Sequence, residues 1–194
     1  MSFNEKFSGA VLAGGRSTRM GTDKALLRIG EELLIERQLR CLRETGAAEL
    51  LISGRFDVDY SRFPAKVIYD EQADAGPLGG LASLLKAAAN PFTLVLAIDM
   101  PAMTVATLAK ILSTCTSNSG CVPVDGDRLQ PLAAAYPKRS LALAKSRLAE
   151  GDFSMHGFVN RAITEKFMQP LPIEAQDLSC FVNWNEPSDW QPTQ

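Results

Sequence analysis

The chain has 194 residues, a length that suits one well-buried domain. Hydrophobic residues make up 46% of it and charged residues 22%, the ordinary balance of a soluble globular protein. A formal net charge of -2 argues against a broad nucleic-acid-binding surface, because contact with a phosphate backbone needs an excess of Lys and Arg on one face.

Short apolar runs alternate with longer amphipathic stretches through the first half of the chain. The predicted strands are residues 8–12, 48–53, 66–69 and 93–98. The predicted helices are residues 33–45, 78–89 and 105–116. Such alternation predicts an α/β fold in which helices cover both faces of a mostly parallel sheet.

The second half is less regular. Residues 120–124 and 129–136 are predicted strands around an Asp-Gly-Asp turn at 125–127, because Asp-Gly between apolar runs favours a hairpin. We predict a helix over 137–150, short strands over 165–170 and 179–182, and a last helical turn opened by Pro187. Since no repeat or linker interrupts the pattern, residues 1–194 are predicted to form a single domain.

Nothing in the sequence predicts a membrane segment or an exported protein. Residues 1–7 are polar and include Glu5, whereas a signal peptide needs an apolar central region. No apolar run approaches the roughly 20 residues that cross a bilayer. We therefore expect a cytoplasmic protein. The four cysteines are scattered without a C-x-x-C pair, so we expect small core residues rather than a zinc site or a disulfide framework.

A glycine-rich loop follows the first predicted strand, with the sequence Leu-Ala-Gly-Gly-Arg-Ser-Thr-Arg-Met-Gly-Thr-Asp-Lys at 12–24. Gly14 and Gly15 lack a Cβ and let backbone N–H groups approach an anion, while Arg19 and Lys24 supply positive charge. The spacing fits neither the G-x-G-x-x-G dinucleotide fingerprint nor a P-loop. The residues alone predict an anion site, with an ordinary strand-to-helix turn as the alternative.

The string at 12–24 resembles the L-A-G-G-x-S-x-R-M-G-x-x-K signature of nucleotidyltransferases with a Rossmann-like fold. Within that superfamily the chain is most similar to the molybdenum cofactor guanylyltransferases. Five further segments carry the resemblance: Val-Ile-Tyr-Asp at 67–70, Gly-Pro-Leu-Gly-Gly-Leu at 76–81, Ala-Ile-Asp-Met-Pro at 97–101, Gln-Pro-Leu at 130–132 and Phe-Val-Asn-Trp-Asn at 181–185. The resemblance implies a three-layer α/β/α fold of the nucleotide-diphospho-sugar transferase kind, with a small antiparallel portion in the second half.

The resemblance also implies a nucleotide site around the glycine-rich loop. Its implied nucleotide-binding residues are Leu12, Ala13, Gly14, Gly15, Lys24, Ser53, Asp70, Gly79 and Asp99. Lys24 would neutralise charge that develops on the phosphates, and Arg19 would contact the leaving pyrophosphate. With Asp99, these two side chains form the predicted catalytic set.

Asp99 is the predicted metal ligand. It follows the most apolar predicted strand, and ligands of open α/β sheets bind outside the carboxyl ends of the strands. A hard carboxylate oxygen suits Mg²⁺, which shares the substrate phosphates. The residues alone also fit an aspartate that caps a turn or helix before Pro101. The superfamily uses this aspartate for Mg²⁺, which favours the metal site.

Asp70 ends a predicted strand, and three interpretations of it remain open. Its carboxylate could accept hydrogen bonds from a guanine edge, face the ribose or cap a turn. Ser53 stands where similar sequences often carry an asparagine, which leaves the base specificity open. The glycine segment 76–80 precedes a predicted helix, whose N-terminus favours an anion or a base edge over a plain loop.

The acceptor side rests on the resemblance, which places Gln130, Asn183 and Asn185 in a molybdopterin pocket. Amide side chains offer both donors and acceptors, as a pterin ring requires. Residues 154–157 depart from the Gly-x-Arg-Arg run of many members. His156 is the only histidine, and no triad or metal cluster can be built around it.

The predicted activity is a Mg²⁺-dependent transfer of GMP from GTP to the phosphate of molybdenum-bound molybdopterin, with release of pyrophosphate. Cytidylyl transfer and transfer to a sugar phosphate are alternatives in the same superfamily. A non-catalytic cofactor carrier and a dinucleotide-dependent oxidoreductase are alternatives from other classes. The resemblance implies molybdoenzymes or their chaperones as partners. The net charge and the apolar runs predict no nucleic-acid partner and no membrane.

Overall fold

The computed structural model describes residues 5–14, 23–70 and 74–184 of the chain. The strands are β1 (Phe7–Leu12), β2 (Arg28–Ile29), β3 (Glu32–Leu33), β4 (Glu49–Gly54), β5 (Lys66–Tyr69), β6 (Phe92–Ala97), β7 (Gly120–Asp125), β8 (Arg128–Leu129), β9 (Ala133–Pro137) and β10 (Met168–Pro172). The α-helices are α1 (Leu34–Glu44), α2 (Gly76–Ala87), α3 (Val105–Thr114), α4 (Ser140–Ala149) and α5 (Met155–Thr164), with 3₁₀ turns η1 (Lys24–Leu26) and η2 (Ala175–Phe181).

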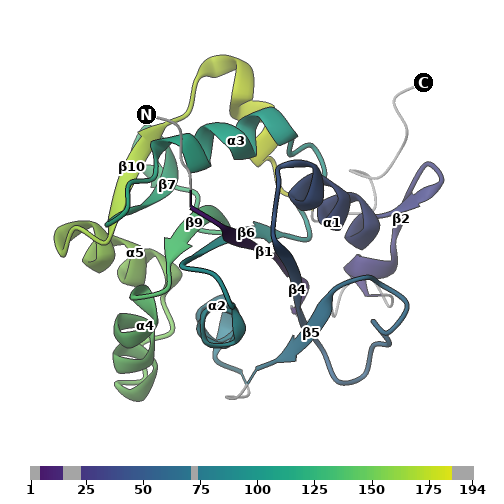
Figure 1. Cartoon of the computed structure of the whole chain (residues 1–194), viewed down its shortest axis with the longest axis horizontal. Helices are drawn as coiled ribbons and strands as arrows, with labels where there is room; N and C mark the ends of the chain where they lie inside the picture. Colours follow the sequence, from purple (N-terminus) through teal and green to yellow (C-terminus); the bar gives the residue numbers. More distant parts are fainter. Residues whose placement is uncertain (1–4, 15–22, 71–73, 185–194) are drawn as a thin grey trace.

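The central sheet has the strand order β10-β7-β9-β6-β1-β4-β5, with β8 paired to β7 (Figure 1). Strands β5, β4, β1 and β6 are mutually parallel, as the alternating pattern predicts. The chain runs from β1 outward through β4 to β5 and then returns to place β6 on the other side of β1. This reversal is a topological switch point, where open α/β sheets bind ligands beyond the carboxyl ends of their strands.

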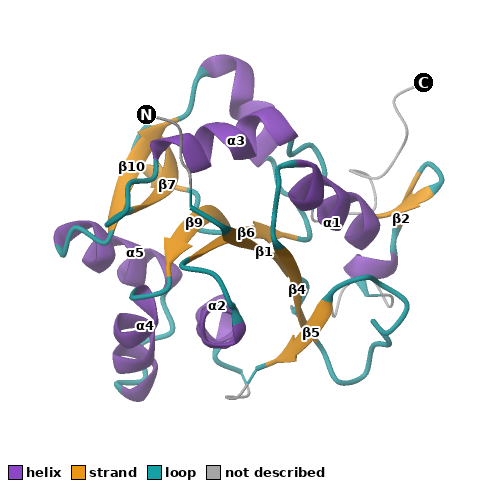
Figure 2. Cartoon of the chain, viewed as in Figure 1, coloured by secondary structure: helices purple, strands orange, loops and turns teal. Residues whose placement is uncertain are grey.

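Helices cover the sheet on both faces, with α1 and α3 on one side and α2, α4 and α5 on the other (Figure 2). β6 shows why both faces are covered, because successive side chains of a strand point in opposite directions. Leu94 and Leu96 pack in the α1 and α3 core, whereas Val95 packs against α2. All three are fully buried. The predicted three-layer α/β/α fold is confirmed.

The antiparallel portion lies in the second half, as predicted. β9 runs antiparallel between β6 and β7, and β7 and β8 form the hairpin at the Asp-Gly-Asp turn. The single strand predicted over 129–136 is wrong, since β8 and β9 are separate. Pro131, which has no N–H to donate, lies between them, and the Tyr136 hydroxyl donates to its carbonyl.

Three other predictions differ from the structure. α5 is absent from the predicted elements, although Met155, Phe158, Val159 and Ala162 follow helical spacing and are all buried. The strand predicted over 179–182 is wrong, because these residues belong mainly to η2 and to the extended residues after it. The strand predicted over 165–170 begins later, at Met168. The helical turn predicted at Pro187 lies outside the described residues.

The four cysteines are buried free thiols, as their predicted place in the core requires. No helix in the described ranges has both the length and the hydropathy to cross a membrane.

Candidate active site

The predicted site residues that the structure describes lie around the carboxyl ends of the four parallel strands. Leu12, the last residue of β1, is in register with Ser53 of β4 on one side and with Ala97 of β6 on the other. The pairing continues one residue further, because the Ala13 N–H donates to the Ser53 carbonyl (3.0 Å) and the Ile98 N–H donates to the Leu12 carbonyl (3.1 Å). The segments after these strands therefore leave the sheet at one common edge.

The first cluster at this edge joins β4, β5 and the start of α2. The buried Ser53 hydroxyl donates to Asp70 Oδ1 at 3.2 Å. Burial raises the pKa of Asp70 above its ordinary value, and the Ser53 hydrogen bond opposes this shift. The structure therefore brings two of the predicted nucleotide-binding side chains into direct contact.

Gly80 is what lets α2 approach these strands so closely. A Cβ at this position would lie 2.9 Å from the Ser53 hydroxyl oxygen and 2.9 Å from a Leu12 methyl carbon. Gly79, the predicted nucleotide-binding glycine, is buried one residue earlier in the first turns of α2. Gly80 thus lets the first turns of α2 lie beside Ser53.

The second cluster joins Lys24, Asp99 and the C-terminal segment. The Lys24 ammonium lies 3.7 Å from Asp99 Oδ2 and donates to the Trp184 carbonyl at 3.1 Å. The Trp184 N–H in turn donates to the Asp99 carbonyl at 2.8 Å. Residues from three distant parts of the sequence therefore meet at the end of β6.

Burial dominates the electrostatics of Asp99. The side chain is 20% exposed, and loss of hydration raises its pKa above the ordinary value, while the Lys24 ammonium opposes the shift. A half-buried carboxylate with one cation nearby keeps lone pairs available for a second cation. A carboxylate so placed could share a metal ion with substrate phosphates.

The two clusters are separated by β1. Asp70 follows β5 and Asp99 follows β6, which lies three strand spacings away. At about 4.8 Å a spacing, the strand ends lie roughly 14 Å apart. An elongated ligand could contact both clusters, with Leu12, Ala13 and Gly14 beneath its middle.

Asp23 is a residue of this site that the sequence reasoning missed. Its Oδ1 accepts a hydrogen bond from the Ala25 N–H (2.8 Å), which caps η1 and sets the position from which Lys24 extends. Burial raises the pKa of Asp23, opposed by this hydrogen bond and by the Arg55 guanidinium at 3.8 Å. The signal was present in the sequence, since an aspartate before a helical turn is a common cap.

Gln130 and Asn183 are the predicted acceptor residues that the structure describes, and they belong to two segments near the β6 end of the site. Gln130 is buried in the β8–β9 connection, whose Leu132 carbonyl accepts the Ala97 N–H at 2.8 Å. Asn183 directly precedes Trp184, and its side-chain oxygen is buried with no hydrogen-bond partner among the described residues. Such an oxygen is costly unless a ligand or solvent donor pairs with it.

Residues 154–157 have a structural explanation. The Ser154 hydroxyl accepts from the Gly157 N–H at 3.0 Å and caps α5. His156 is exposed on the first turn of that helix. The departure from the family's basic run therefore coincides with a well-formed helix start.

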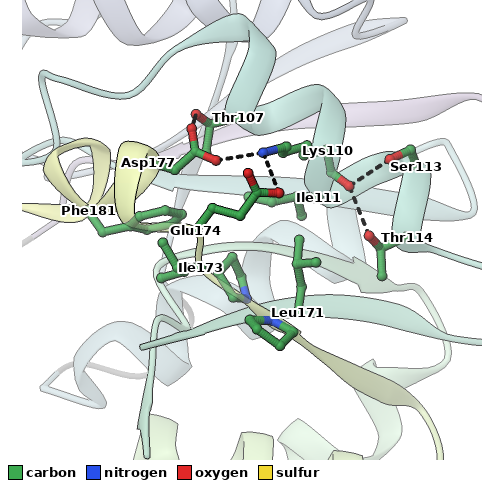
Figure 3. A pocket seen from close by; sticks show the side chains of 12 residues that line it. Thr107, Lys110, Ile111, Ser113, Thr114, Leu171, Ile173, Glu174, Asp177 and Phe181 are labelled. Carbon is green, nitrogen blue, oxygen red and sulfur yellow. Dashed lines mark hydrogen bonds and ion pairs between the residues drawn. The ribbon is translucent and has the colours of Figure 1, made fainter. Parts of the chain in front are cut away.

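Ion pairs attach the C-terminal segment to α3. The Lys110 ammonium lies 2.9 Å from Glu174 and 2.8 Å from Asp177, which are just before and within η2 (Figure 3). Beneath them is a cavity of about 210 Å³, and none of the predicted site residues lines it. These contacts anchor the segment that carries Trp184 back to Asp99.

Gly15, Arg19 and Asn185 lie outside the described residues. Within the described ranges, no group of three or more His, Cys, Asp or Glu side chains could hold a metal by itself. Asp99 nevertheless fits Mg²⁺, because this ion is commonly held by one or two carboxylates together with substrate phosphates and water.

Comparison with known proteins places the chain among relatives of similar length. Residues 9–166 match the family described as the MobA-like NTP transferase domain. A "probable molybdenum cofactor guanylyltransferase" from Opitutus terrae is 40% identical over 94% of this chain and 92% of its own. A molybdenum cofactor guanylyltransferase from Xanthomonas euvesicatoria is 35% identical over 98% and 95% of the two chains. The crystal structure of molybdopterin-guanine dinucleotide biosynthesis protein A from Archaeoglobus fulgidus has the same fold, with a TM-score of 0.72 at 23% identity over 94% of each chain.

Proposed function

The chain belongs to the MobA-like NTP transferase family, and we propose from this that it transfers GMP from GTP to the phosphate of molybdenum-bound molybdopterin. The products are the guanine dinucleotide form of the cofactor and pyrophosphate. The single observation that carries the proposal is the convergence of Lys24 and Asp99, 3.7 Å apart, at the switch point of the sheet.

In this reaction a phosphate oxygen of the acceptor attacks the α-phosphorus of GTP. The new P–O bond forms as the bond from the α-phosphorus to the β-phosphate oxygen breaks, and pyrophosphate leaves with the electron pair. The substrate itself supplies the nucleophile, so the protein needs only to position the phosphates and to stabilise their charge. This agrees with the position of His156, which is exposed on α5 rather than at the strand ends.

Lys24 and Asp99 divide the phosphate chemistry between them. The Lys24 ammonium would stabilise negative charge on the phosphates as the α-phosphorus is attacked. Asp99 would hold Mg²⁺ on its carboxylate oxygens, together with the phosphates. When bound, the ion supplies charge neutralisation and alignment of the reacting oxygens. We extend the proposal to Arg19 on the pyrophosphate and to Gly15 in the phosphate loop.

The other cluster is proposed to hold the nucleoside. The carboxylate of Asp70 can accept two hydrogen bonds from a base. Ser53 helps to orient this carboxylate by donating a hydrogen bond to its Oδ1 atom. The guanine N1–H and exocyclic amine are such a pair of donors. The roughly 14 Å between the two strand ends supports a nucleotide that extends from Asp70 to Asp99 across β1.

The acceptor would lie on the β6 side of the phosphates. The unpaired oxygen of Asn183 supports this position, because a pterin offers the N–H donors that this buried atom lacks. Gln130 and Asn185 are proposed to complete the pocket.

The test is a nucleotide panel on the full chain. The protein is incubated with Mg²⁺, molybdenum-loaded molybdopterin and each of ATP, GTP, CTP and UTP, and both pyrophosphate and the dinucleotide product are measured. We expect product with GTP, and loss of product in the Asp99→Asn variant but not in a control, Asp125→Asn, which changes an exposed carboxylate at the β7–β8 hairpin. Product with CTP but not with GTP would reject the guanylyl assignment.

A further inference from the structure

The turn that carries Asp99 is held from beneath by one side chain of α1. Gln38 is fully buried, and its Nε2 donates to the Ala97 carbonyl (3.0 Å) and to the Met100 carbonyl (2.9 Å). These two carbonyls flank Asp99 in the sequence. Both N–H bonds of a single amide therefore span the turn, and because both partners are acceptors, only the NH₂ group of Gln38 can face them.

Gln38 is the buried member of a set of contacts around this turn. On the open side, the Trp184 N–H donates to the Asp99 carbonyl at 2.8 Å. At the far end, Arg37 Nε donates to the Pro101 carbonyl at 2.5 Å. Arg37 and Trp184 are partly exposed, whereas Gln38 is inaccessible to solvent. Of these three residues, Gln38 is the one whose side chain solvent does not reach, so water cannot take over its hydrogen bonds to the turn.

The Gln38 amide is a costly way to fill this space. Its Oε1 is buried and has no hydrogen-bond partner among the described residues. A buried acceptor left unpaired is unfavourable, and an apolar side chain of the same volume would remove that cost. Its stabilising contacts all go to the main chain of the Asp99 turn. Both donors of this amide are therefore used on the turn that carries Asp99.

We propose that Gln38 is a positioning residue for the transfer reaction, fixing the 97–100 turn so that the Asp99 carboxylate points at the divalent cation shared with the nucleotide phosphates. This inference rests on the proposed function. Mutation of groups that orient a metal ligand without touching the metal typically costs roughly 10- to 100-fold in metal affinity or activity. Gln38 acts on the ligand through its main chain rather than through its carboxylate.

The test compares Gln38→Met with a matched control, Thr93→Val. Methionine keeps the length of the side chain and removes the two donors. Thr93 is equally buried, lies at the other end of β6, and has a hydroxyl oxygen with no partner among the described residues. Mn²⁺ affinity is measured by electron paramagnetic resonance on the full chain with a non-hydrolysable GTP analogue. We expect Gln38→Met to weaken Mn²⁺ binding about tenfold, and Thr93→Val to bind as the wild type does.

Steady-state kinetics give a second readout. Gln38→Met should lower kcat/KM for Mg²⁺–GTP about tenfold, with part of the loss in KM, because the ion that Asp99 would hold is shared with the GTP phosphates. Gln38→Glu has the same length, and its protonated form donates one hydrogen bond, so its Mn²⁺ affinity should lie between those of wild type and Gln38→Met. It also keeps the test decisive if Gln38→Met does not fold.

Wild-type Mn²⁺ affinity in both Gln38 variants would overturn the inference. Equal weakening in Thr93→Val would also overturn it, because the effect would then follow from any change in the buried core. Failure of the proposed function would give different experimental results. Asp99→Asn would bind Mn²⁺ as tightly as the wild type, or the wild type would form no product with any nucleotide.

Discussion

Replacing Asp99 by Asn should stabilise the protein and abolish its activity. The substitution keeps the shape of the side chain and removes a charge that burial disfavours. The pKa of Asp99 is raised in the folded state, so the folded protein binds this proton more tightly than the unfolded chain does. The resulting contribution to stability is fully present below the ordinary pKa of 3.8 and is lost as the pH rises through the folded pKa.

Two opposing energies decide whether the Asp99→Asn variant is more or less stable than the wild type. The Lys24 ammonium at 3.7 Å attracts the carboxylate by about 4 kcal/mol at an effective dielectric constant of 20 and by about 1 kcal/mol in bulk water. Since the pKa is nevertheless raised, the cost of burial exceeds this attraction. The Asn variant avoids both energies, and the net result at pH 7 is a gain in the free energy of unfolding. Loss of the metal ligand should remove about 4 kcal/mol of transition-state stabilisation, or roughly a thousandfold in kcat.

Thermal unfolding followed by circular dichroism measures the first effect, at pH 7 and near pH 4 without nucleotide or metal. The gain in Tm should be present at pH 7 and shrink at the lower pH, where a growing share of the wild-type carboxyl is protonated. Asp125→Asn, at an exposed position, should change neither Tm nor kcat. A variant less stable than the wild type at pH 7 would refute the reasoning, because attraction to Lys24 would then outweigh burial.

Three further substitutions test neighbouring parts of the structure. Gly80→Val should raise the KM for GTP about tenfold, because a Cβ would lie 2.9 Å from the Ser53 hydroxyl oxygen and push α2 from β4; an unchanged KM would contradict this. Ser53→Ala removes the hydrogen bond that lowers the pKa of Asp70, so calorimetric GTP affinity should begin to fall at a higher pH during acidification than in the wild type. Coincident pH profiles would count against a nucleoside contact at Asp70. Gly120→Ala should prevent folding, seen as loss of the circular dichroism spectrum, because a Cβ would lie 2.1 Å from the Ala135 carbonyl oxygen.

Most of the sheet could be predicted because its central strands are buried on both faces. A strand such as β6 is then a continuous apolar run, flanked by residues that stop it. The predictions failed where a segment has few apolar residues and their spacing fits more than one local conformation. In η2, Cys180 and Phe181 are buried against α3, and a short apolar pair of this kind fits a strand or a 3₁₀ turn equally well. Its assignment depends on tertiary contacts such as Lys110 with Asp177.

The residues of the candidate site also fall into those that could be predicted from the sequence and those that could not. Lys24 and Asp99 could be predicted because each follows a strand in a recognisable motif, and the structure brings them together. The roles of Gln38 and Trp184 could not, because Gln38 contacts main-chain carbonyls of the Asp99 turn and Trp184 takes part through its own main chain. A main-chain contact constrains the position of a residue without requiring a motif around it. Gln38 and Trp184 are 61 and 85 residues away from Asp99 in the sequence.

The charges at the phosphate end explain why a cation should be required. The charges of Lys24 and Asp99 lie so close together that their fields cancel at a distance, so the pair offers no net attraction to a triphosphate. Arg55, another nearby cation among the described residues, is already directed at Asp23 and Asp57. A divalent ion between Asp99 and the phosphates would satisfy the carboxylate and leave the Lys24 ammonium to the reacting phosphate. This ammonium also contacts the Trp184 carbonyl, and the Trp184 N–H donates to the Asp99 carbonyl, so a metal and nucleotide bound here would act on one connected set of contacts.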